Sequence, residues 1–207
     1  MEKYYDLILE NTEKEVALLL KKQVLDKDSS AYGGIKNLED GLCHPGAGVE
    51  AFRKFTAVYV NSSSRFFEKE SLKKALNLLL DYIARVQNED GTFDLLTTNF
   101  YCAPTTAFIT QDLGFAYKIM KKNKLTGDLK DNLYQIIEKA GKGMVGGGFH
   151  TPNHRWVMSS ALMMASNITG KEEFKKEAQA YLKEGIDCNQ YGEFTERSPG
   201  VYNAVND

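Results

Sequence analysis

The chain has 207 residues, which fits a single domain, and its hydrophobic share of 43% and charged share of 26% are ordinary for a soluble globular protein. Its formal net charge of −2 gives no electrostatic reason to expect a nucleic acid or an anionic membrane as a partner. The apolar runs are too short for a transmembrane helix, and the first residues lack the pattern of a secretory signal, so the compartment stays open.

Apolar residues recur at helical spacing along most of the chain, and short segments rich in glycine, asparagine and aspartate separate these stretches. Proline is acceptable in a first helical turn and lysine is favoured in a last one, so Pro104 and Lys122 mark one helix clearly. We expect seven helices and no strand, with a further helix beginning near Tyr202. The helices are expected at residues 2–26, 49–60, 71–86, 104–122, 128–144, 153–167 and 171–185.

Three turns share one layout, in which glycine is followed by an aromatic residue and then by a polar lead-in to a helix. They lie at residues 91–94, 147–150 and 192–195, and a looser relative lies at 32–35. Each interval between the three turns is long enough for two helices, so the recurrence predicts stacked helical hairpins. The aromatic residues of the turns are expected to be core plugs: Phe93, Phe149 and Phe194.

The predicted fold class is therefore all-α, with helical hairpins arranged either as an open α-solenoid or as part of an α/α toroid, an incomplete barrel. In a toroid the inner helices all begin at one end, and the loops before them line a central cleft. Helix starts carry unpaired N–H groups and suit an anionic ligand, so this rim is the predicted functional face. We expect one domain over residues 1–207. We also expect it to be cut from a longer protein, because residues 200–207 have the pattern of the first residues of a secondary-structure element.

Neither a metal nor another cofactor is expected. The cysteines are three and widely spaced, which is no disulfide framework, and we expect Cys43, Cys102 and Cys188 to be reduced and packed. Cys43 and His44 are adjacent, but neither belongs to a CxxC or HxxxH pair that would anchor a zinc site there. The glycines at 146–148 lack the lysine and hydroxyl residue of a phosphate-binding loop.

The densest polar cluster begins at His150 and includes Asn153 and His154 at an expected helix start, and Tyr202 follows in the stretch Arg-Ser-Pro-Gly-Val-Tyr-Asn. This combination resembles the α/α-toroid polysaccharide lyases of the heparinase II/III and related alginate-lyase type. The resemblance covers mainly residues 147–207. It implies β-elimination on a uronic-acid-containing polysaccharide, and hence an acidic polysaccharide or oligosaccharide as partner. Those enzymes have more toroid helices and a β-rich second half, neither of which this chain contains.

The resemblance also implies a role for each matching residue. Asn153 or His154 would neutralise the uronate carboxylate and so spread charge in the enolate-like transition state. Tyr202 would be the base and the acid, and a nearby cation would have to favour its phenolate, because tyrosine normally has a pKa of about 10. The remaining site residues are expected to bind substrate, the arginines through charge and the aromatic residues by stacking: Arg155, Trp156, Arg197, Tyr101 and His150.

Plain structural roles stay open for the same residues. Asn153 is a residue type favoured at helix caps, and His154 is equally able to cap the helix. Tyr202 fits a packed tyrosine with a satisfied hydroxyl, and Trp156 fits a core position as well as a sugar platform.

Two other functions remain alternatives. A toroid glycoside hydrolase needs two carboxylates, about 5–5.5 Å apart for retention of configuration or about 6.5–9.5 Å for inversion. Asp94, Glu193 and Glu196 are its main candidates. A noncatalytic α-solenoid that binds a partner predicts instead that Asn153, His154 and Tyr202 lie far apart.

Overall fold

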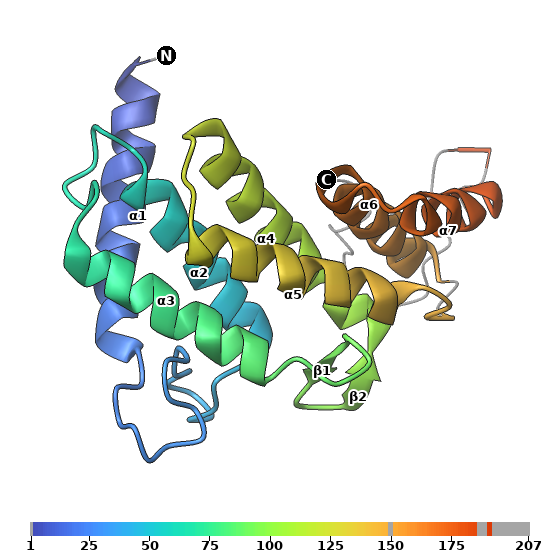
Figure 1. The fold of residues 1–207 in the computed structure, drawn as a ribbon, viewed down its shortest axis with the longest axis horizontal. Helices are drawn as coiled ribbons and strands as arrows, with labels where there is room; N and C mark the ends of the chain where they lie inside the picture. The colour runs from blue at the N-terminus through green and yellow to red at the C-terminus, as the bar shows by residue number, and fades with distance from the viewer. Residues whose placement is uncertain (1, 149–150, 186–189, 192–207) are drawn as a thin grey trace.

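The structure, a computed structural model, describes residues 2–148, 151–185 and 190–191 (Figure 1). Within these residues the chain is mostly helical, which confirms the all-α prediction. It contains seven helices and one short hairpin: α1 (Glu2–Lys22), α2 (Pro45–Tyr59), α3 (Glu70–Arg85), β1 (Phe93–Leu95), β2 (Asn99–Cys102), α4 (Ala103–Lys122), α5 (Asp128–Met144), α6 (Pro152–Thr169) and α7 (Glu172–Lys183).

The helices form two layers. The even-numbered helices pack against one another in the order α2, α4, α6, and each odd-numbered helix packs against the even-numbered helix next to it. α5 also contacts α3 and α6, and Figure 1 shows α3 and α5 lying across α2 and α4. Each even-numbered helix carries proline in its first turn, where a missing N–H costs nothing: Pro45, Pro104 and Pro152.

One expectation was wrong, because the described residues contain strands. The turn at residues 91–94 leads into the antiparallel pair β1–β2 before α4 begins, whereas we expected it to lead directly into the helix. The strands have three and four residues, which is too short for an alternating apolar pattern to be recognised. The seven helices expected between residues 2 and 185 all exist, with ends displaced by a few residues, and α5 has the predicted bounds. The further helix expected near Tyr202 lies outside the described residues.

The core lies between the two layers. Phe52 and Phe55 of α2 are fully buried there, and so is Phe93, which confirms that the aromatic residue of this turn is a core plug. Cys43 and Cys102 are buried and free, as expected, while Phe149, Phe194 and Cys188 lie outside the described residues.

A buried glutamine fastens the end of α1 to the next odd-numbered helix. Gln23 Nε2 donates to the carbonyl oxygens of Gly33, at 3.0 Å, and of Ala75 in α3, at 2.9 Å. Gly33 has a φ of +89° and lies so close to α3 that an added Cβ would be 2.2 Å from the Leu78 carbonyl oxygen. The turn therefore needs glycine both for its backbone angle and for its contact with α3.

The same arrangement recurs at the end of α3. Gln87 Nε2 donates to the carbonyl oxygens of Gly91, at 3.0 Å, and of Ile136 in α5, at 3.1 Å. Gly91 has a φ of +96°, and an added Cβ would lie 1.9 Å from the Lys139 carbonyl oxygen. We call each set of glutamine, glycine and neighbouring-helix carbonyl a clamp. The two clamps show that the turn at 32–35 is a structural relative of the turn at 91–94.

Replacing Gly91 by alanine tests the clamp geometry. We expect Gly91→Ala to lower the free energy of unfolding by about 2–4 kcal/mol, because left-handed backbone strain adds to the collision with Lys139. Gly170→Ala is the matched control, since Gly170 has a left-handed φ of +75° and ψ of +7° with nothing within 4 Å of an added Cβ, and it should cost only about 1 kcal/mol. Urea unfolding followed by circular dichroism measures both, and equal losses would contradict the close approach.

Candidate functional site

The candidate site lies at the rim, by which we mean the end of the even-numbered layer where α4 and α6 begin. Gly147, in the turn before α6, is so close to the start of α4 that an added Cβ would lie 2.6 Å from the Ala103 Cβ atom. The two helix starts are therefore neighbours in space, as the rim prediction requires.

The first turn of α6 presents Asn153 and His154 in one small hydrogen-bonded group. Thr151 Oγ1 donates to Asn153 Oδ1 at 3.1 Å and lies 2.8 Å from His154 Nδ1. The tautomer of His154 decides whether the ring nitrogen or the Thr151 hydroxyl donates in this contact. Asn153 is the second residue of the helix, not its cap, and it is only 4% exposed, whereas His154 is partly exposed.

Arg155 joins the start of α6 to the end of α7. It is 6% exposed, and its Nη1 donates to the Glu184 carbonyl oxygen at 3.3 Å and lies 3.7 Å from Glu184 Oε2. These protein contacts favour a role in holding the two helices together over direct contact with a substrate. The next residue, Trp156, is 36% exposed, so one part of its ring packs and another part faces solvent.

The β1–β2 hairpin carries the exposed Tyr101 at the other side of the rim. Tyr101 is 65% exposed, and its φ of +51° is uncommon for a residue other than glycine. Its N–H donates to Asp94 Oδ1 at 2.8 Å, and Asn88 Nδ2 donates to the same oxygen at 2.7 Å. Asp94 thus fixes the hairpin that holds Tyr101 in place.

Two further carboxylates, Asp90 and Asp112, have structural partners too. Asp90 Oδ1 accepts from Thr92 N and Oγ1 at 2.9 and 2.7 Å, which closes the turn. Asp112 Oδ1 lies 2.6 Å from Arg53 Nε, although burial raises the pKa of the Asp112 carboxyl. Glu193 and Glu196 lie outside the described residues.

The structure describes two tyrosines that lie close to Tyr202 in the sequence, Tyr181 and Tyr191. Tyr181 is 3% exposed, and its hydroxyl oxygen accepts from Gly148 N at 3.1 Å. Burial raises the pKa of Tyr181, which opposes the phenolate form that a base would need. Tyr191 is exposed. The surroundings of Tyr181 oppose its use as a general base, and Tyr202 stays the predicted base.

Asn153, His154 and Arg155 are consecutive residues, and the structure places all three in the first turn of α6. Three predicted site residues lie outside the described part of the chain: His150, Arg197 and Tyr202. Beside the rim, the turn before α6 and helix α7 enclose a cavity of about 190 Å³ lined by Gly146, Gly148, Glu177, Ala180, Tyr181 and Glu184.

The described residues contain no group of three or more histidine, cysteine, aspartate or glutamate side chains placed to hold a metal ion. Of the helices that the structure describes, none is both long enough and apolar enough to cross a membrane. No protein-family model matches the sequence, and none of the curated proteins matches it.

Replacing Asp94 tests its role in the hairpin. We expect Asp94→Ala to lower the free energy of unfolding by about 1–2 kcal/mol, because Asn88 and Tyr101 N lose a charged acceptor. Asp94→Asn keeps an acceptor oxygen and should cost less. Thermal unfolding of both variants measures the difference, and an unchanged stability in Asp94→Ala would show that these hydrogen bonds contribute nothing.

Proposed function

We propose that the chain is part of an α/α-toroid lyase that cleaves a uronic-acid-containing polysaccharide by β-elimination. The observation that carries the proposal is the first turn of α6, where Asn153 and His154 lie together at the rim, as the resemblance to such lyases requires. Arg155 links this turn to the end of α7 through its contacts with Glu184.

The two-layer packing supports the toroid arrangement. In a toroid, an inner ring of helices alternates along the chain with an outer ring, and in this chain the even-numbered and odd-numbered helices alternate in that way. The even-numbered layer leaves aromatic side chains exposed, among them Phe108 and Phe115 of α4 and Trp156 of α6. Such side chains would face the centre of a ring and provide sugar-stacking surfaces near the rim.

The chemistry assigns each residue a task. His154 Nδ1 lies 2.8 Å from Thr151 Oγ1, and in the protonated form the imidazolium donates to the uronate carboxylate. The neutralised carboxylate accepts negative charge more readily when the C5 proton leaves. Asn153, being more buried, orients this turn and contributes its amide dipole.

Tyr202 is the proposed base. The phenolate takes the C5 proton, the C4–C5 double bond forms, and the C4–O bond breaks with its electron pair moving to the departing oxygen. The phenol then returns a proton to that oxygen. Arg197 is the proposed cation that lowers the pKa of Tyr202, because Arg155 is already engaged with Glu184.

The hydrolase alternative is weaker on one specific observation. Asp94, its main described candidate, uses Oδ1 to accept two hydrogen bonds that build the β1–β2 hairpin. A hydrolase would yield a product without a double bond, so the product itself separates the two reactions.

Replacing Tyr202 tests the mechanism. The full-length protein should release a product with the ultraviolet absorbance of an unsaturated uronic acid from at least one of polygalacturonate, alginate and unsulfated chondroitin. We expect Tyr202→Phe to lower this rate by about 10²–10⁴-fold, because it removes the proton acceptor. Tyr181→Phe is the matched control and should keep most of the activity. Full activity in Tyr202→Phe would remove Tyr202 from its assigned role.

A further inference from the structure

A second recess lies at the end of the even-numbered layer that is opposite to the rim, where α2 and α4 finish. It consists of two cavities of about 300 and 340 Å³ that share Val60, Ser62 and Asn123 as lining residues. We call this pair of cavities the distal groove. Each volume lies at the lower end of the range typical of ligand-binding pockets, about 300–1,000 Å³.

The lining of the distal groove combines aromatic rings with amide and hydroxyl groups. Tyr5 of α1, 49% exposed, lines one cavity, and the exposed Phe67 lines the other. Asn61, Ser62 and Asn123 supply the polar groups. Sugars present apolar ring faces and many hydroxyl groups, so flat aromatic side chains and planar amides are complementary to them.

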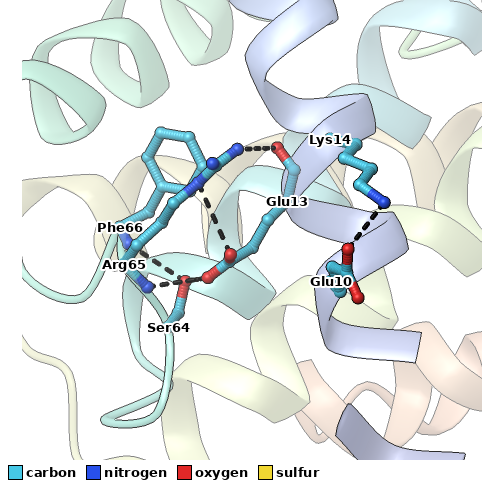
Figure 2. A network of polar contacts seen from close by, with 6 residues as sticks. All are labelled: Glu10, Glu13, Lys14, Ser64, Arg65 and Phe66. Carbon is cyan, nitrogen blue, oxygen red and sulfur yellow. Dashed lines mark hydrogen bonds and ion pairs between the residues drawn. The ribbon is translucent and has the colours of Figure 1, made fainter. Parts of the chain in front are cut away.

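One wall of the distal groove is held in place by a polar network between α1 and the loop after α2 (Figure 2). Glu13 Oε1 accepts from Ser64 Oγ and Arg65 N, both at 2.7 Å, and Arg65 Nη2 donates to the Glu13 carbonyl oxygen at 3.1 Å. Ser64 Oγ also accepts from Phe66 N at 3.0 Å. Because these bonds already fix the loop, a ligand would not need to order it, which lowers the cost of binding.

A hydrogen bond across one cavity and two residues with positive φ indicate that the walls of the distal groove are held in one conformation. Asn61 Nδ2 donates to Tyr5 Oη at 2.8 Å, which joins the two sides of one cavity. Glu68, which lines the other cavity, has a φ of +48°, and Lys124, next to Asn123, has a φ of +56°. Residues held in this backbone region cost free energy and tend to occur where the surrounding structure fixes them, often at binding sites.

We infer that the distal groove binds a sugar unit of an acidic polysaccharide, away from the rim. Lys122 lines the cavity that contains Tyr5, so its ammonium group is available to a uronate carboxylate while the Tyr5 ring meets the sugar face. The carboxyl ends of α2 and α4 carry partial negative charge, and Glu68 lines the adjoining cavity. The single ammonium group of Lys122 therefore suits a ligand with one carboxylate and many hydroxyl groups, and not a densely charged one. The identity of the ligand rests on the proposed function, whereas the groove does not.

The distance between the two sites gives the distal groove a role. α4 runs from the rim to the groove, and 20 residues of helix span about 30 Å. A polysaccharide that is bound at both ends would be retained between cleavage events, since a second binding site on the same molecule raises the effective concentration of substrate.

Titration with defined oligosaccharides tests the inference. Hexasaccharides of polygalacturonate, alginate and unsulfated chondroitin are added to the ¹⁵N-labelled chain, and the side-chain amide signals of Asn61 and Asn123 are followed by NMR. We expect these signals to shift with at least one hexasaccharide. Lys122→Gln should weaken that binding about tenfold, because a charge-assisted hydrogen bond contributes about 1.5 kcal/mol or more.

The chain offers a matched control for each variant. Lys121 belongs to the same last turn of α4 as Lys122 but does not line the groove, and Tyr4 precedes Tyr5 in α1 and does not line it either. Lys121→Gln and Tyr4→Ala should therefore bind as the unmodified chain does. Tyr5→Ala should weaken binding severalfold. Equal weakening by Lys121→Gln and Lys122→Gln would show general charge attraction and overturn the inference.

The outcomes separate this inference from the proposed function. Unsaturated product without any shift at Asn61 or Asn123 would overturn the distal groove and leave the lyase intact. Shifts without any product, with the expected variant effects, would support the groove and contradict the lyase.

Discussion

The arrangement of this chain depends on a buried glutamine that donates from one amide nitrogen to two carbonyl oxygens. Gln23 and Gln87 each bind the carbonyl of a glycine in the following turn and a carbonyl in the next odd-numbered helix. Buried carbonyl groups without a donor are costly, so each clamp satisfies two acceptors and fixes one hairpin against the next. Gly33 and Gly91 complete the contact, since their missing side chains let the turn approach the helix.

The clamps explain why the loops before α2 and α4 lie at one end of the layer. Each clamp returns the chain to the same end before the next even-numbered helix starts, so the segments before α2 and α4 are placed by the same geometry. The first turn of α6 follows the α4 start closely, as Gly147 and Ala103 show. A repeated structural junction thus produces a rim on which loops are able to vary in sequence and carry chemistry.

Much of this fold was predictable from the sequence, because helical periodicity and turn residues are local signals. The helices and the buried Phe93 followed from these signals, and the relation between the turns at 32–35 and 91–94 was visible as a shared glycine pattern. The β1–β2 hairpin was not predictable, since its short strands depend on Asp94 accepting from the distant Tyr101 backbone. Gln23 and Gln87 were missed because their helix partners lie 52 and 49 residues away in the chain. A glutamine that precedes each of these glycine turns was the available signal. The candidate site stays a prediction, because Asn153 and His154 lie at the start of α6 as expected, whereas Tyr202 lies outside the described residues.

The most direct test of the clamp is the unfolding free energy of Gln23→Leu and Gln87→Leu in urea, each alone and then combined. Each substitution leaves two buried carbonyl groups without their side-chain donor, and we expect each to cost about 1–3 kcal/mol, with the two losses adding because the sites share no partner. Asn77→Leu on the exposed face of α3, where the side chain bonds only to the carbonyl one turn earlier, should change stability by less than about 0.5 kcal/mol. If both glutamine variants unfold at the same urea concentration as the unmodified chain, the glutamines do not hold the hairpins together.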